Sequence, residues 1–171
     1  TLAAGGTLQG LVGYNYPDQC TGGIAGWNLD TITTSNVANS GRFIASECVG
    51  GIAGFSDMYS VLRGCNYASE ATALLKAECF DGAYYMEGSF PITNATGGVA
   101  GILGDSAQVL YCSAMINGTL QATTTYNGGT AYGPVGGLVG RTDVNGLVTD
   151  SGVNVVNAAD ARTTWIGNQE M

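Results

Sequence analysis

The sequence contains no histidine among its 171 residues. Ser-His-Asp and Cys-His catalysis and most zinc hydrolases are therefore excluded. Only five basic residues stand against 13 acidic ones, so the net charge is −8 and no basic patch is available for nucleic acid or an anionic membrane surface. No apolar run approaches the roughly 20 residues of a membrane-spanning helix. We expect a non-enzymatic chain with no cofactor, no metal site, no nucleic-acid partner and no membrane span.

Charged residues are also scarce, at 11%, whereas 45% of the residues are hydrophobic and 28 are glycine. This mixture is too apolar for a disordered chain. The prominence of Thr, Val, Ile, Tyr, Asn, Ser and Gly favours many short strands joined by tight turns. We expect one all-β domain over residues 1–171. Because Thr1 is not an initiator residue, we expect it to be a part or a processed form of a larger surface protein.

One short motif recurs along the chain: two glycines, an aliphatic residue, Ala or Val, and a third glycine. Four copies begin at residues 22, 50, 97 and 136, so the gaps are 28, 47 and 39 residues. A β-helix coil takes roughly 20–30 residues. The first gap fits one coil, and the second fits two coils or one coil with an insertion. We predict a β-solenoid of irregular repeats, in the form of a right-handed parallel β-helix. The repeat glycines are Gly22, Gly23, Gly26, Gly50, Gly51, Gly54, Gly97, Gly98, Gly101, Gly136, Gly137 and Gly140.

These glycines have a structural explanation. Successive coils of a solenoid stack at about 4.8 Å, so equivalent residues form columns. A position at a sharp corner, or against a neighbouring backbone, must then be glycine in every coil. The aliphatic residue after each glycine pair is predicted to form a core column of Ile24, Ile52, Val99 and Leu138. A phosphate-binding loop is rejected, because no copy ends in Gly-Lys-Ser/Thr.

Residues 69–79 differ from the rest of the chain. Ser69 is a suitable N-cap, and Ala71, Leu74, Leu75 and Glu78 fall along one side of a helix. We therefore expect a short helix near residues 69–79.

The cysteines keep register with the repeat. Cys20 and Cys48 each precede a glycine pair by two residues, and Cys65 and Cys112 each follow the start of one by fifteen. Each pair is therefore expected to share a column. Two interpretations remain open: buried thiols that act as small hydrophobic residues, or disulfides between coils, with Cys20–Cys48 the foremost pair.

Four aspartates also follow the repeat. Asp30, Asp57, Asp105 and Asp143 lie seven or eight residues after the start of a glycine pair. Carboxylates in one column would suit calcium binding or glycoside hydrolysis. The competing interpretation, which we favour, is that Asp marks the turn between the first two strands of each repeat.

The repeat resembles the GLUG motif, on the strength of Gly50-Gly51-Ile52-Ala53-Gly54, Gly97-Gly98-Val99-Ala100-Gly101 and Gly136-Gly137-Leu138-Val139-Gly140, each followed by a polar turn, a strand and a segment led by Cys or Ser. GLUG repeats occur in large bacterial surface and secreted proteins, including adhesins. The resemblance covers residues 22–155 and implies a β-solenoid in an extracellular or cell-surface setting. The uneven spacing and the extra cysteines depart from the motif.

From these features we expect an extracellular structural or adhesive module. Uncapped solenoid ends favour stacking with further copies, so we expect homo-oligomers, a filament or a surface layer. Host or matrix glycans are candidate partners. The alternative is a carbohydrate-binding or polysaccharide-processing β-helix, and a passive spacer is a third hypothesis.

Overall fold

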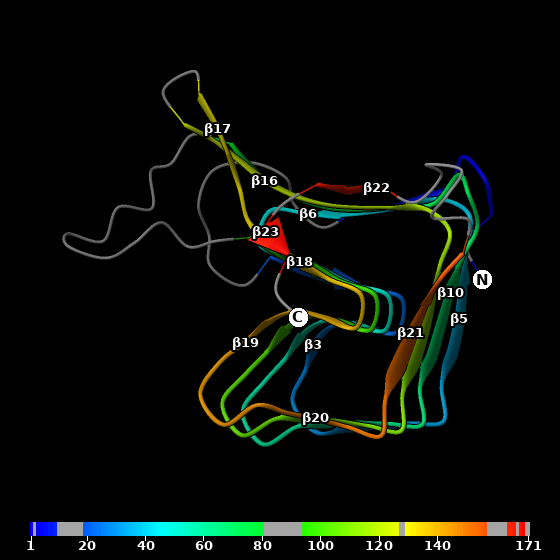
Figure 1. The fold of residues 1–171 in the computed structure, drawn as a ribbon, viewed down its shortest axis with the longest axis vertical. Helices are drawn as coiled ribbons and strands as arrows, with labels where there is room; N and C mark the ends of the chain where they lie inside the picture. The colour runs from blue at the N-terminus through cyan, green and yellow to red at the C-terminus, as the bar shows by residue number, and fades with distance from the viewer. Residues whose placement is uncertain are drawn as a thin grey trace.

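A computed structural model describes residues 1, 3–9, 19–80, 94–126, 129–156, 164–166 and 168–169. These residues form short β-strands and turns, with no helix in any of the described segments. Nearly all strands pair in parallel and stack into a β-solenoid (Figure 1). The predicted fold class is therefore confirmed, whereas its right-handed sense stays a prediction.

Each turn of the solenoid, which we call a coil, contains five strands. Coil 1 contains β2 (Cys20–Gly22), β3 (Ala25–Asn28), β4 (Thr31–Thr33), β5 (Asn36–Asn39) and β6 (Arg42–Ala45). Coil 2 contains β7 (Cys48–Gly50), β8 (Ala53–Ser56), β9 (Val61–Arg63), β10 (Asn66–Ser69) and β11 (Leu74–Phe80). Coil 3 contains β12 (Ala95–Gly97), β13 (Ala100–Leu103), β14 (Gln108–Leu110), β15 (Ser113–Ile116) and β16 (Thr119–Tyr126). Coil 4 contains β18 (Pro134–Gly136), β19 (Val139–Thr142), β20 (Leu147–Thr149), β21 (Gly152–Val155) and β22 (Thr164–Ile166).

Equivalent strands of the four coils build five sheets, which we number in chain order. Sheet I starts with β2, sheet II with β3, sheet III with β4 and sheet IV with β5. Sheet V contains β6, β11, β16 and β22, and β1 (Thr7–Gln9) pairs with β6 at its edge. Three strands lie outside the four coils: β1, β17 (Gly129–Tyr132), which is antiparallel to β16, and β23 (Asn168–Gln169), which extends sheet I.

Each glycine pair therefore begins one coil. The first strands of successive coils start at Cys20, Cys48, Ala95 and Pro134, which gives steps of 28 (48 − 20), 47 (95 − 48) and 39 (134 − 95) residues. The 47-residue step is one coil with an insertion between β11 and β12. The 39-residue step includes the β16–β17 hairpin.

The predicted helix near residues 69–79 is wrong, because Leu74–Phe80 form strand β11. This strand pairs on one side with β6 and on the other with β16. Its side chains alternate: Leu75 and Ala77 are buried, while Lys76 and Glu78 are half-buried and form an ion pair of 2.6 Å. Backbone bonds to two neighbouring coils override the helical preference of Ala, Leu, Lys and Glu.

The cross-section of each coil is folded back on itself (Figure 1). Sheets I and II run in opposite directions, and the turn between them points at sheet IV. One continuous core lines the inner sides of all five sheets, and its largest fully buried side chains include Phe43, Ile52, Leu62, Tyr67 and Leu75.

Candidate functional site

The repeat glycines form the fold-back between sheets I and II. A Cβ atom on the first glycine of the motif would lie 1.9 Å from a carbonyl oxygen three residues later, as at Gly50 with Ala53 and Gly97 with Ala100. A Cβ on the third glycine of the motif would collide with sheet I of the preceding coil. At Gly101, for example, the added Cβ would lie 2.7 Å from the Val49 nitrogen. Real Cβ contacts are essentially never this short. The two sheets can therefore approach only where both columns are glycine.

The middle glycine of each motif forms the tip of the fold-back, which packs on sheet IV. A Cβ on Gly51 would lie 2.3 Å from the Tyr67 ring, and a Cβ on Gly23 would lie 2.7 Å from Val37. The next residue starts the predicted core column. Ile52 and Val99 are fully buried, Leu138 is partly buried, and Ile24 in coil 1 is 51% exposed.

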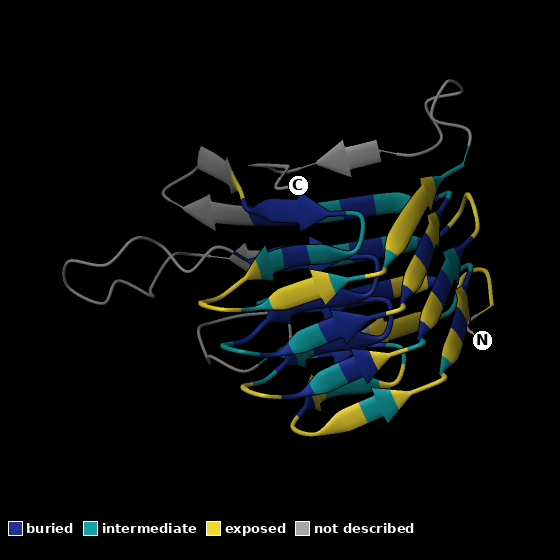
Figure 2. Ribbon diagram, turned by 60° about the horizontal axis from the view of Figure 1, so that its bottom comes forward, coloured by how far each residue is buried: buried dark blue, intermediate teal, exposed yellow. Residues whose placement is uncertain are grey.

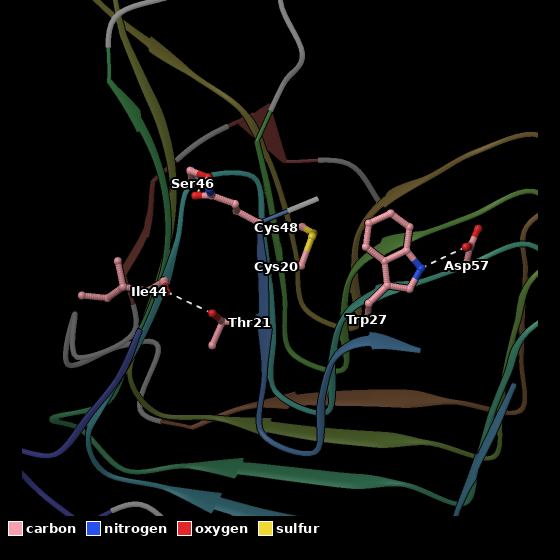
Figure 3. The surroundings of a disulfide bond; sticks show 8 residues. Cys20, Thr21, Trp27, Ile44, Ser46, Cys48 and Asp57 are labelled. Atoms are coloured by element: carbon pink, nitrogen blue, oxygen red, sulfur yellow. Dashed lines mark hydrogen bonds between the residues drawn. A yellow bond between two sulfur atoms is a disulfide. The ribbon is translucent and has the colours of Figure 1, made fainter. Parts of the chain in front are cut away.

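A disulfide joins the first two coils. Cys20 and Cys48 are directly paired in sheet I, with 4.6 Å between their Cα atoms. This separation lies within the usual range for disulfides. Nearby, the Thr21 hydroxyl donates to the Ile44 carbonyl oxygen at 3.1 Å, which ties sheet I to sheet V (Figure 3). The disulfide interpretation is correct for this pair.

The disulfide lies beside an aromatic cluster from sheet II. Phe55 packs against the group that contains Cys20 and Cys48, and Trp27 meets Phe55 edge to face with ring centroids 4.8 Å apart. The indole Nε1 of Trp27 donates to Oδ2 of Asp57 at 2.9 Å (Figure 3). The Trp27 ring is thus held in place while its side chain remains exposed.

Cys65 and Cys112 are buried free thiols, so the other interpretation holds for this pair. The Cys112 thiol donates to the Leu110 carbonyl oxygen at 3.3 Å and also accepts a bond of 3.4 Å from the Cys65 N–H. Ser151 repeats the arrangement in coil 4: its hydroxyl donates to Thr149 and accepts from the Cys112 N–H. Burial raises the pKa of the Cys112 thiol. The column is therefore a set of side chains that satisfy the backbone at one corner.

The four aspartates all lie in turns before strands of sheet III, and they do not form one column. Asp57 and Asp143 are equivalent. The backbone N–H of each donates to the carbonyl oxygen of the last residue of the sheet II strand in the preceding coil. Gly104 takes that place in coil 3, and Asp105 lies one residue later. Asp143 pairs with Arg141 at 3.3 Å. The described residues contain no group of three or more potential metal ligands.

Sequence reasoning did not single out the buried pair of Tyr67 and Asn39. The Asn39 side-chain amide donates to the Tyr67 hydroxyl at 3.1 Å. Burial raises the pKa of the Tyr67 phenol above its ordinary value, and the bonds from Asn39 and Ser69 oppose that shift. No sequence pattern separates Asn39 from the exposed Asn36 of the same strand, and only the burial of Asn39 makes a partner for its amide necessary.

The described part of the chain contains no helix that could cross a membrane. Comparison with known proteins gives no family: no family model matches the chain, and neither the curated proteins nor the solved structures include a match.

Proposed function

We propose that the chain is a structural β-solenoid module of a secreted or cell-surface protein, with adhesive capacity on its outer faces. The observation that carries this proposal is a continuous parallel ladder of four coils with a disulfide between the first two. Disulfides persist in oxidising compartments outside the cytosol. The resemblance of the repeat to GLUG motifs supports the same setting.

Contacts that repeat from coil to coil fix the shape of the module. Glycine columns lock sheet I onto sheet II, and a column of Ser and Cys side chains satisfies the corner before sheet IV. Both sets of contacts repeat from coil to coil, so the module is rigid along its axis.

The test is the state of the chain in its source cells. Antibodies against the folded chain should label intact cells or the culture medium, and peptide mapping of that material should recover Cys20 linked to Cys48. Material found only inside the cells, with both thiols reduced, would contradict the proposal.

Carbohydrate binding is a second candidate, favoured by Trp27. Its exposed indole is fixed by Phe55 and Asp57, and a fixed aromatic ring suits stacking on a sugar. The sequence has two tryptophans, Trp27 and Trp165. Titration with matrix polysaccharides should quench tryptophan fluorescence in the wild type and in Trp165→Phe, which retains Trp27, but not in Trp27→Phe. Equal responses in the two variants would exclude Trp27 as the binding residue.

A further inference from the structure

Exposed apolar side chains concentrate at the two ends of the solenoid. Val148 and Val153 in coil 4 are 40% and 44% exposed, although the residues in the same columns of coils 2 and 3 are buried. Ile24 in coil 1 shows the same contrast with Ile52 and Val99. In sheet III, the outer strands β4 and β20 are mostly exposed, whereas β9 and β14 between them are more buried (Figure 2). These side chains occupy core positions that lack one further coil.

The same ends carry unpaired strand edges. Within the described chain, β19, β20 and β21 pair on one side only, and so do β3, β4 and β5 at the opposite end. All six strands run in the same parallel sense as their sheets. A free edge of this kind is a template for another strand.

We propose that a second copy of this chain covers these edges head to tail, with coil 1 of one copy on coil 4 of the next. Extending the register by one step places Leu138 on Ile24, Val148 on Ile32 and Val153 on Val37. Ser151 falls on Ser35, which continues the corner column. Because the contact joins two different surfaces, it does not close and produces a filament.

The charges at the two ends are compatible. Arg141 falls on Trp27, where a guanidinium can stack on the indole face. Asp143 falls on Leu29 and Asp150 on Thr34, so no carboxylate meets another in these columns. The net charge of −8 opposes the approach of two copies. Salt that screens this repulsion therefore promotes assembly.

Two short strands must lose their present pairing for this contact to form. β2 of the incoming copy takes the place of β23, and β22 of the receiving copy takes the place of β1. The pairings lost are two residues of β23 with β18 and three residues of β1 with β6. In exchange, all five sheets become continuous across the contact.

This inference rests on the proposed function, since assembly extends a structural scaffold. The two can fail separately, because a chain that stays monomeric could still be a structural module. The experiment follows the mass of the purified 171-residue chain by light scattering over a concentration and salt series. The measured mass of the wild type should increase with protein concentration and with salt, and electron microscopy should show filaments. Val148→Lys and Ile24→Lys should each remain monomeric when alone. Met115→Lys is the matched control: Met115 is 44% exposed but lies in coil 3, away from both ends, so this variant should assemble as wild type does.

Mixing the two end variants tests the head-to-tail geometry. Each retains one intact end, so an equimolar mixture should give heterodimers and nothing larger. Wild type that stays monomeric at every concentration and salt would overturn the inference. So would assembly of Val148→Lys or Ile24→Lys alone, or a mixture that remains monomeric although circular dichroism shows both variants folded.

Discussion

At the scale of single residues, the fold-back depends on the absence of a Cβ atom. In Gly97→Ala the new methyl would lie 1.9 Å from the Ala100 carbonyl oxygen, which belongs to backbone and cannot rotate away. We expect a loss of about 3 kcal/mol in the free energy of unfolding, measured by denaturant titration. Gly152→Ala is the control, because nothing lies within 4 Å of its Cβ position. Equal effects of the two substitutions would contradict the assigned role.

Tyr59 is a residue under backbone strain. It has φ of 60° and is 71% exposed, so packing does not compensate the left-handed conformation. The equivalent position in coil 4 is Asn145, which has φ of 59° and tolerates this region better. Tyr59→Asn should raise the free energy of unfolding by about 0.5–1 kcal/mol. The control is Met58→Asn in the same turn, which should change it by less than about 0.5 kcal/mol. A destabilised Tyr59→Asn would show that the tyrosine makes a stabilising contact.

The repeat glycines could be predicted from the sequence because backbone contacts in every coil impose the same residue. The aspartates could not be placed in the same way. Their spacing of seven or eight residues conceals a one-residue shift, and that shift separates Asp105 from the Asp57 position. A turn tolerates carboxylates at several of its positions, so composition alone does not fix the register.

At the scale of elements, β11 shows why the 69–79 segment was predicted wrongly. Leu75 and Ala77 alternate with Lys76 and Glu78, which is a strand period. Residues with high helix propensity concealed this pattern, and the deciding partners β6 and β16 are distant in the sequence. The coil count was open for the same reason, since the long gap is identified as an insertion only by strand pairings across it, such as that of β11 with β16.

The corner column before sheet IV predicts which side chains can replace Cys112. Serine occupies the equivalent place in coils 1 and 4, where it donates to the carbonyl two residues earlier. Cys112→Ser should therefore cost about 1 kcal/mol or less of unfolding free energy. Cys112→Val removes both the donor and the acceptor and leaves the Cys65 N–H unsatisfied. It should lower the free energy of unfolding by about 2–3 kcal/mol more than Cys112→Ser does. Thermal unfolding measures the stability of the two variants, and a valine variant more stable than the serine variant would contradict the hydrogen-bonding role of Cys112.

The raised pKa of Cys112 predicts the alkaline behaviour of the same column. In the unfolded chain the thiol ionises above about pH 8.5, whereas burial keeps it protonated in the folded state. The folded state then binds more protons than the unfolded state, so stability falls as pH rises above that value. Denaturation midpoints between pH 7 and 10 should fall less steeply for Cys112→Ser than for wild type. Identical slopes would show that Cys112 makes no contribution.

At the scale of the whole molecule, the coils form one register-matched stack from β2 to β21. Over the described residues, the stack explains three features together: glycine in columns, a disulfide between adjacent coils, and apolar core positions that are exposed at the ends. It also accommodates the insertion between β11 and β12, because both strands pair with the equivalent strands of the neighbouring coils.

The most direct test of this stacking is a cross-link across the longest gap. Asn66 and Ser113 are paired neighbours in sheet IV although 47 residues separate them, and Asn36 lies one coil further away. Adjacent strands are about 4.8 Å apart and next-nearest strands about 10 Å. After mild oxidation with a glutathione mixture, peptide mapping should find the new disulfide in Asn66→Cys/Ser113→Cys and not in Asn36→Cys/Ser113→Cys. Cross-linking of the second pair, or of neither pair, would contradict the account that coils 2 and 3 stack directly.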